Sequence, residues 1–259
     1  MGGQACRCFC WAGVPASSKN AGTMVGPKIT TGVSLILPMF NEAAGVDRTM
    51  RLALAELERD FADFEIIIAD DASTDDCAAQ VAAWAVREPR IRLVRLPHNQ
   101  RFGGALRAGL AAAVKPYLFY TDFDLQIGLD CLPALLREFD SADVLTGYSA
   151  NQGKHANWRS AVISWGYNFS VRTLFGLRLR DINFGFKAMP KTVYNKMSLR
   201  SCSPFVDAEM FVQARANGHT IKEVAVPFSM RQAGVSHIRR LDVIAWTFWD
   251  MFRLWLRRL

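Results

Sequence analysis

The sequence contains no run of about 18 uncharged apolar residues, so no segment is predicted to span a bilayer. It also lacks the cysteine framework of a small secreted domain, because three of its six cysteines lie in CRCFC and the others are scattered singly. Neither G-x-G-x-x-G nor G-x-x-x-x-G-K occurs, which excludes the dinucleotide fingerprint and the P-loop. We therefore expect a protein of a reducing compartment without either of these nucleotide motifs.

Apolar residues make up 51% of the 259 residues, which is enough for a real core in one large or two small domains. Residues 1–26 are rich in glycine, alanine and serine. Their stretch CWAGVPA is too short and too poorly flanked for a signal peptide, so we expect a disordered leader. The formal net charge is +7, with lysine and arginine gathered in the second half. This charge favours a phosphate-rich partner or an anionic membrane surface.

Short β-rich blocks alternate with helical patterns along the chain. The blocks are nearly continuous in apolar residues, as in strands of a parallel sheet that is covered on both faces. We expect strands at 33–37, 65–69, 91–95, 117–121 and 143–147. Helices are expected near 43–58, 74–87, 102–115 and 130–138, the second of them capped by Ser73 or Thr74. The pattern predicts an α/β fold with an open, mostly parallel sheet flanked by helices.

Carboxylates lie at the ends of two of these strands. Asp70 and Asp71 end the second strand, and Asp122 and Asp124 follow the fourth with one residue between them. In open α/β sheets, ligands bind beyond the carboxyl ends of the strands. Alternate residues of an extended segment point the same way, so Asp122 and Asp124 can face one Mg²⁺ or Mn²⁺ ion. A lone D-x-D is typical of a solvated turn, but its place at a strand end favours a metal ion with a nucleotide diphosphate.

An ordered set of motifs from about Val33 to Arg239 resembles the family 2 glycosyltransferases of the GT-A fold. The resemblance is greatest to the dolichol- or polyprenyl-phosphate mannosyl- and glucosyltransferases. The motifs are LPMFNE, IIIADDASTDD, GGALRAGL, TDFDLQ, DINFGFKAM, FVDAEM and RQAGVSH. The resemblance implies a nucleotide pocket formed by Pro38, Phe40, Glu42, Ala69 and Asp71, in which Asp71 accepts a hydrogen bond from the base or ribose.

The same resemblance implies a metal and diphosphate site and a basic pair near the donor phosphates. The metal site is Asp122, Asp124 and Gln126, and the basic pair is Arg231 and His237; Asp122, Asp124, Arg231 and His237 are the expected catalytic residues. Three positions depart from the family pattern and leave the donor sugar and base open. They are Phe123 within the metal motif, Tyr148 in place of an arginine, and His237 in place of a lysine.

Few catalytic side chains are needed if the acceptor is a polyprenyl phosphate. Its oxygen is already anionic at neutral pH, so an inverting displacement requires no general base. An acceptor hydroxyl would require one, and Asp207 or Glu209 are candidates, although capping and pairing on a surface helix explain them equally well. Arg159 and Lys187 are the candidate residues that bind the acceptor phosphate.

The tail at 239–259 carries a helical apolar stripe with arginines at its borders and ends. A helix packed on the domain would explain the stripe. However, Trp246, Trp249 and Trp255 widen the apolar face, and tryptophan together with arginine favours a helix that lies in the membrane interface.

We therefore expect a leader at 1–26, a GT-A glycosyltransferase domain at 27–238 and an amphipathic membrane-interface helix at 239–259. The expected enzyme is a metal-dependent hexosyltransferase using Mg²⁺ or Mn²⁺, peripheral on the cytoplasmic face of a membrane. Its donor would be a sugar of the GDP-mannose or UDP-glucose type and its acceptor a polyprenyl or dolichyl phosphate, with no nucleic acid. A membrane-embedded partner protein is left open. The alternatives are transfer to a sugar or glycolipid hydroxyl, and a non-catalytic nucleotide-sugar-binding protein.

Overall fold

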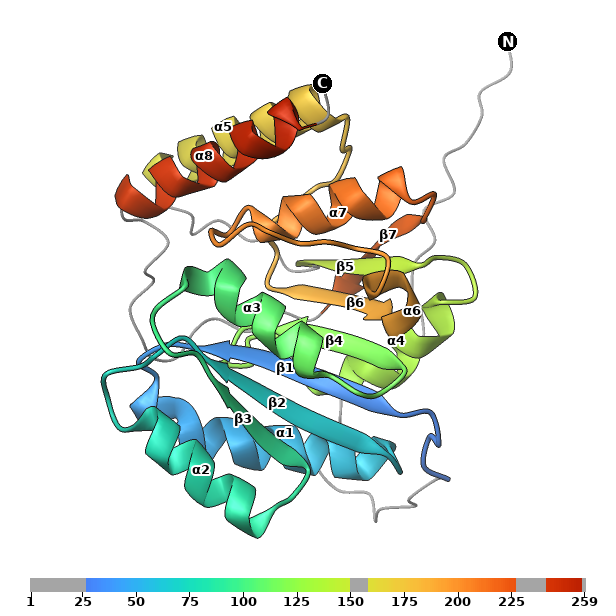
Figure 1. The fold of residues 1–259 in the computed structure, drawn as a ribbon. Helices are drawn as coiled ribbons and strands as arrows, with labels where there is room; N and C mark the ends of the chain where they lie inside the picture. Colours follow the sequence, from blue (N-terminus) through green and yellow to red (C-terminus); the bar gives the residue numbers. More distant parts are fainter. Residues whose placement is uncertain (1–26, 150–157, 227–240, 258–259) are drawn as a thin grey trace.

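A seven-stranded sheet forms the centre of the molecule (Figure 1). The computed structural model describes residues 27–149, 158–226 and 241–257. The strand order is β3-β2-β1-β4-β6-β5-β7, in which β3, β2, β1 and β4 are parallel neighbours and β6 is antiparallel to both β4 and β5. The strands are β1 (Val33–Met39), β2 (Phe64–Asp70), β3 (Ile91–Arg95), β4 (Tyr117–Thr121), β5 (Val144–Ser149), β6 (Phe186–Pro190) and β7 (Ile221–Val226).

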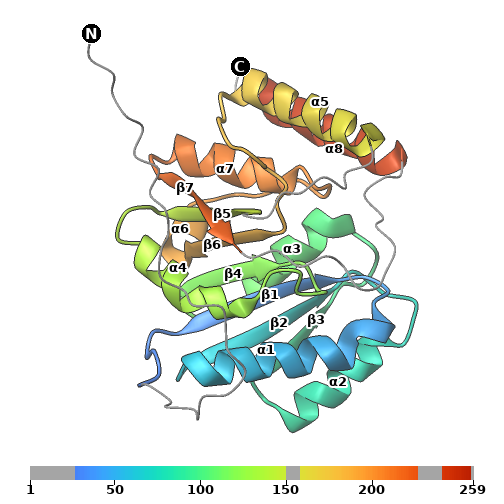
Figure 2. The ribbon, with the colours of Figure 1, turned by 180° about the vertical axis from the view of Figure 1, so that it is seen from behind.

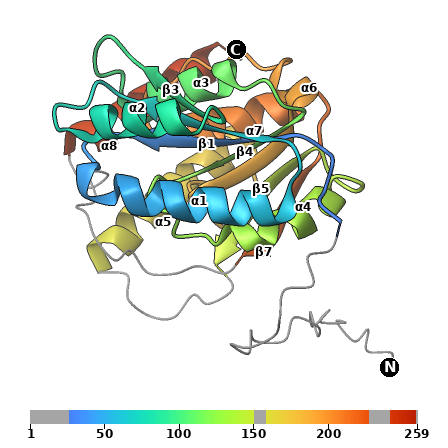
Figure 3. The same ribbon diagram turned by 90° about the horizontal axis from the view of Figure 1, so that it is seen from below.

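Helices cover both faces of the sheet, which is why every residue of β1 and β2 is buried. Figure 3 shows β1 between α1 on one side and α3 on the other. One core cluster joins the sheet to α1, α2 and α4, and a second joins it to α3, α5, α7 and α8. The helices are α1 (Val46–Asp60), α2 (Cys77–Arg87), α3 (Arg101–Ala112), α4 (Leu132–Glu138), α5 (Trp158–Phe175), α6 (Lys191–Tyr194), α7 (Val206–Ala216) and α8 (Leu241–Leu256).

The five predicted strands and the mostly parallel sheet are confirmed. The predicted cap of the second helix is wrong, because α2 begins at Cys77 and neither Ser73 nor Thr74 caps it. Instead, Asp75 Oδ1 accepts a hydrogen bond from the backbone N of Cys77 at 3.1 Å. The Ser73 hydroxyl is used elsewhere, since it accepts from the backbone N of Asn41 at 2.9 Å.

Helix α8 lies side by side with α5 above α7, as Figures 1 and 2 show from opposite sides. One face of α8 packs against the rest of the protein. Met251 is buried in the second core cluster, and Asp250 Oδ2 accepts hydrogen bonds from Ser203 N and Oγ. The other face is exposed and aromatic, with Trp249 52% and Phe252 47% exposed. Within the described residues, no helix is both long enough and apolar enough to cross a membrane.

Candidate active site

The carboxyl ends of β1, β2, β3 and β4 meet at one edge of the sheet because these strands are parallel. Each of these strands is followed, before or at the start of the next helix, by a non-glycine residue in the left-handed region. The residues are Asn41, Ala72, Arg101 and Leu125, with φ between 49° and 64°. Such residues cost about 1 to 3 kcal/mol each and are concentrated at functional sites. They are the only non-glycine residues with positive φ in the described part of the chain, so this edge is the candidate site.

The loops after β1 and β2 hold each other in place. The Asn41 side-chain oxygen accepts a hydrogen bond from the backbone N of Thr74 at 2.9 Å. In return, the Ser73 hydroxyl accepts from the backbone N of Asn41. Asp75 Oδ2 accepts from the backbone N of Ala43 at 3.0 Å. The DASTD segment is therefore an acceptor-rich loop whose side chains fix the neighbouring turn.

Asp70 and Asp71 have different surroundings. Asp70 is fully buried, and its Oδ1 accepts a hydrogen bond from the backbone N of Ser73 at 3.1 Å. Asp71 is 3% exposed, and its Oδ1 accepts from the backbone N of Gln100 at 2.6 Å, just before α3. Burial raises the pKa of Asp71, although the backbone amide of Gln100 opposes the shift. Asp71 thus joins the β2 loop to the start of α3.

The other predicted nucleotide-pocket residues divide into core and edge positions. Phe40 and Glu42 are half-buried in the loop that follows β1, and Pro38 is a buried residue within that strand. Ala69 is fully buried, and a Cβ at Gly109 of α3 would lie 3.2 Å from its methyl group. The Ala69 side chain therefore packs under α3, and the place of Ala69 in the nucleotide pocket stays a prediction.

Asp122 begins a tight turn at the end of β4. The backbone N of Leu125 donates to the carbonyl oxygen of Asp122 at 3.1 Å, and Leu125 has a φ of 49°. Phe123 is buried in the first core cluster, and its carbonyl oxygen accepts from the hydroxyl of Thr49 at 3.0 Å. Since Phe123 points into the core, its ring anchors the turn that carries the two carboxylates.

The donor atoms of this turn suit a hard divalent cation. Asp122 and Asp124 offer carboxylate oxygens, and the amide of Gln126 donates to Asp124 Oδ2 at 2.7 Å. Among the described residues, no group of three or more His, Cys, Asp or Glu side chains is placed to hold a metal ion. Two carboxylates fit Mg²⁺ or Mn²⁺, which take their remaining ligands from substrate phosphates and water.

Lys187 lies in the interior on β6. Its side chain is fully buried, and Nζ lies 2.6 Å from Asp207 Oδ2 and donates to the Phe184 carbonyl oxygen at 2.7 Å. The hydroxyl of Tyr120 donates to the other oxygen of Asp207. Burial raises the pKa of Asp207, and the ammonium of Lys187 opposes the shift. The expectation that Lys187 seats an acceptor phosphate is corrected, since its charge is already neutralised in the core.

Glu209 is also a buried residue of α7. Its carboxylate accepts hydrogen bonds from the backbone N of Arg200 and, at 2.8 Å, from the backbone N of Ser201. Asp207 and Glu209 therefore pair and cap within the interior, and not on a surface helix. Neither carboxylate is placed as an exposed base.

The side chains of three predicted site residues lie outside the described part of the structure. Arg231 and His237 lie outside the described residues, and so do residues 1–26. Arg159 lies on α5, but its side chain is likewise outside the described part.

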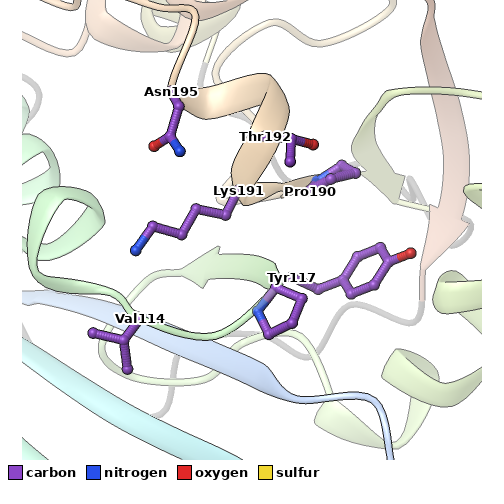
Figure 4. A pocket seen from close by; sticks show the side chains of 7 residues that line it. Val114, Tyr117, Pro190, Lys191, Thr192 and Asn195 are labelled. Atoms are coloured by element: carbon purple, nitrogen blue, oxygen red, sulfur yellow. The ribbon is translucent and has the colours of Figure 1, made fainter.

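A cavity of about 400 Å³ lies at the opposite edge of the sheet (Figure 4). Tyr117 begins β4 and Pro190 ends the antiparallel β6, so these two lining residues mark the edge away from Asp122. Lys191 donates to the Ala113 carbonyl oxygen there. This cavity is separate from the candidate active site.

Sequence reasoning missed Gly185, which precedes β6 and lies against Asp122. A Cβ built on Gly185 would lie 2.3 Å from Asp122 Oδ2. The glycine in NFGFKAM is visible in the sequence, but no local pattern places it beside a carboxylate 63 positions earlier, because only the β4–β6 pairing brings the two together.

Comparison with known proteins matches this sequence to one family. The profile of the family described as "Glycosyl transferase family 2" matches residues 34–202. Among curated proteins, glycosyltransferase AglD of Haloferax volcanii is 31% identical over 75% of this chain and 32% of its own length. Undecaprenyl-phosphate mannosyltransferase of Micrococcus luteus is 26% identical over 79% of this chain and 86% of its own length. Dodecaprenyl-phosphate galacturonate synthase of Rhizobium johnstonii is 26% identical over 79% of this chain and 61% of its own length.

Solved structures agree on the fold. Glucosyl-3-phosphoglycerate synthase of Mycobacterium tuberculosis, crystallised with Mn²⁺, UDP and glucosyl-3-phosphoglycerate, has a TM-score of 0.64 and 16% identity. The match covers 86% of this chain and 79% of that one. The sheet and the helices that flank it thus form a GT-A fold. The chain belongs to glycosyl transferase family 2.

Proposed function

We propose that this protein is an inverting hexosyltransferase that moves a sugar from a nucleotide diphosphate to a polyprenyl phosphate. The observation that carries the proposal is the Asp122 turn at the carboxyl end of β4, on the same sheet edge as the loops after β1 and β2. The names of the Micrococcus luteus and Rhizobium johnstonii relatives, which refer to undecaprenyl and dodecaprenyl phosphate, support the acceptor class.

Asp122, Asp124 and Gln126 would hold Mg²⁺ or Mn²⁺ together with the donor diphosphate. When bound, the ion stabilises the negative charge that develops on the departing nucleoside diphosphate. Phe40, Glu42 and Asp71 would line the nucleoside, above the buried Pro38. Arg231 and His237 are proposed to assist the departing diphosphate from a segment outside the described residues.

The carboxylates of α7 are already paired within the protein and are not available as a general base. This favours an acceptor whose attacking oxygen is already negatively charged. Asp207 is bound to Lys187, and Glu209 caps the segment at Arg200 and Ser201. A phosphate oxygen can attack the anomeric carbon without losing a proton to the enzyme, whereas a hydroxyl would need a base. Arg159 on α5 remains the proposed seat for the acceptor phosphate.

Attachment to the cytoplasmic face of a membrane is proposed through α8. Its exposed face includes Trp249, Phe252 and Leu256, and neighbouring α5 exposes Trp165 and Phe169. Side chains of this kind gain free energy when they enter the interface between lipid headgroups and acyl chains. A peripheral enzyme attached in this way could reach an acceptor lipid that lies in the membrane.

The test is transfer of labelled sugar from a panel of nucleotide sugars to undecaprenyl or dolichyl phosphate in detergent or vesicles, with Mn²⁺ or Mg²⁺. Label in a lipid that releases the sugar in mild acid supports the proposal. Label only in a glycolipid or oligosaccharide would favour a hydroxyl acceptor. Binding of nucleotide sugar without transfer to any acceptor would favour a non-catalytic protein.

A further inference from the structure

The Asp122 carboxylate rests against a residue without a side chain. A Cβ built on Gly185 would lie 2.3 Å from Asp122 Oδ2, 2.9 Å from its Cγ and 3.4 Å from its Oδ1. Contacts below 3.0 Å do not occur for real Cβ atoms, so any side chain at residue 185 would displace something. The close approach therefore depends on glycine at this position.

Strand pairing and an internal ion pair fix the position of Gly185. Thr121 pairs with Phe186 in the antiparallel β4–β6 ladder, which sets the residues Asp122 and Gly185 beside each other. The carbonyl oxygen of Phe184 accepts from Lys187 Nζ at 2.7 Å. Lys187 is in turn held by Asp207 of α7 at 2.6 Å. The segment that presents Gly185 is thus tied to the core at both of its ends.

We propose that Gly185 is a positioning residue that determines where the Asp122 carboxylate lies, and so how tightly the site binds a divalent cation. The proposal rests on the proposed metal role of Asp122. The open space at Gly185 lets the carboxylate lie back against the backbone of the segment before β6, and the Lys187–Asp207 pair keeps that backbone in place. In this proposal Gly185 acts only through Asp122.

A methyl group at Gly185 would move the carboxylate and leave the fold intact. The atoms that it meets are the far end of the short Asp122 side chain, which can rotate, and they are not backbone atoms. Gly185 is half-buried, and its φ lies outside the left-handed region, so alanine can adopt its backbone conformation. Gly185→Ala should therefore change metal binding with little loss of thermal stability.

The experiment compares Gly185→Ala with Asp122→Ala and with a control, Gly166→Ala. Gly166 lies within α5, where an added Cβ would have no neighbour within 4 Å. The apparent Kd for Mn²⁺ is measured by calorimetry at saturating UDP or GDP, together with Tm and the Mn²⁺ dependence of turnover. We expect Gly185→Ala to raise the apparent Kd for Mn²⁺ about tenfold or more, a size usual for residues that orient metal ligands. Excess Mn²⁺ should restore its turnover. Gly166→Ala should match the wild type in Mn²⁺ binding and turnover, with an equal or higher Tm because alanine favours a helix interior.

The double variant separates positioning from a merely structural role. Once Asp122 is alanine, nothing remains for a methyl group at residue 185 to displace. Gly185→Ala should then have no further effect on Mn²⁺ binding or Tm. A wild-type Kd for Mn²⁺ in Gly185→Ala would overturn the proposal, and so would loss of folding, because the Asp122 side chain is expected to give way before the backbone. If Asp122→Ala itself bound Mn²⁺ normally, the proposed metal site would be wrong as well.

Discussion

Asp70 Oδ2 lies 3.2 Å from Nε of Arg95, so the last residues of β2 and β3 form an ion pair across the candidate edge. Arg95 also donates from Nη2 to the Ser73 carbonyl oxygen at 3.2 Å, and Asp70 accepts from the backbone N of Ser73. Asp70 is therefore bound to its own loop and to the neighbouring strand. Its chain neighbour Asp71 contacts Gln100 instead, on the way to α3.

This division predicts opposite effects for two isosteric substitutions. Asp70→Asn should lower the free energy of unfolding by about 1 to 3 kcal/mol, because it removes a charged partner from a buried network, and should leave donor affinity almost unchanged. Asp71→Asn can still accept from Gln100 and should keep stability, but should weaken binding of the nucleoside diphosphate about tenfold. Calorimetry with UDP and GDP and denaturant unfolding measure the two effects. Equal losses of affinity, or the reverse order, would show that the assignment of the pair is wrong.

The strands were predictable because continuous apolar blocks bounded by turn residues carry a strong local signal. The segment EIIIA predicts a buried strand, and β2 occupies Phe64–Asp70. Strands β6 and β7 were not predicted. In β6 the second residue is Lys187, which interrupts the apolar pattern, and its burial depends on Asp207, which comes 20 positions later on α7.

The site was predictable only where it follows strand ends. Asp122 and Asp124 follow the end of β4 as expected, since the end of a strand fixes where the next residues begin. They lie in a turn, however, and not on the extended segment from which a shared ion was inferred. The surroundings of Lys187 and Ala69 depend on packing between distant elements, which no local pattern reports. Nor does the sequence reveal that Ala72 adopts a φ of 56°, because alanine has no preference for that region.

The metal-site carboxylates should be essential for turnover and dispensable for folding. Asp122 and Asp124 lie in a turn at the sheet edge and are half-buried, so alanine at either position removes no core packing. We expect each substitution to lower turnover roughly a hundredfold or more through loss of charge stabilisation at the departing diphosphate. Sugar transfer at several Mn²⁺ concentrations measures the loss, with Tm as the control. Wild-type turnover in the presence of a chelator would contradict the metal site altogether.

The Lys187–Asp207 pair should behave as a buried ion pair. Lys187→Met alone leaves the Asp207 carboxylate without its cation and should destabilise the protein by about 3 to 5 kcal/mol. The double variant Lys187→Met with Asp207→Leu should recover much of that loss, because it buries no uncompensated charge. Urea unfolding of the wild type, both single variants and the double variant gives the coupling energy. Additive losses would mean that the two side chains do not depend on each other.

Glu65 should make stability depend on pH in the acid range. Burial acts to raise its pKa, but hydrogen bonds from Val114 N at 2.6 Å and Ser34 Oγ at 2.7 Å, with the Arg92 guanidinium, lower the pKa below the usual value of a glutamate. A lowered folded-state pKa adds stability that is complete above the unfolded pKa and is lost as pH falls through the folded pKa. Between roughly pH 5 and 3, the free energy of unfolding should therefore fall less steeply in Glu65→Gln than in the wild type. Parallel curves from urea unfolding at each pH would contradict this.

The exposed face of α8 should be needed for membrane binding and not for folding. Deleting residues 241–259 is a poor test, because it would also remove Met251 from the core and Asp250 from the backbone amides of Cys202 and Ser203. The double variant Trp249→Ser with Phe252→Ser removes two half-exposed rings and spares the buried face.

Binding of an interfacial helix scales with the apolar area that enters the lipid, so this double variant should reduce co-sedimentation with anionic liposomes about tenfold or more. Val86→Ser on α2, where the side chain is 85% exposed, is the matched control, and it should bind liposomes like the wild type. Tm and nucleoside diphosphate binding should stay unchanged in both variants, since exposed side chains contribute little to stability. If the double variant binds liposomes normally while Tm falls sharply, the aromatic face of α8 serves packing within the protein and the membrane proposal is wrong.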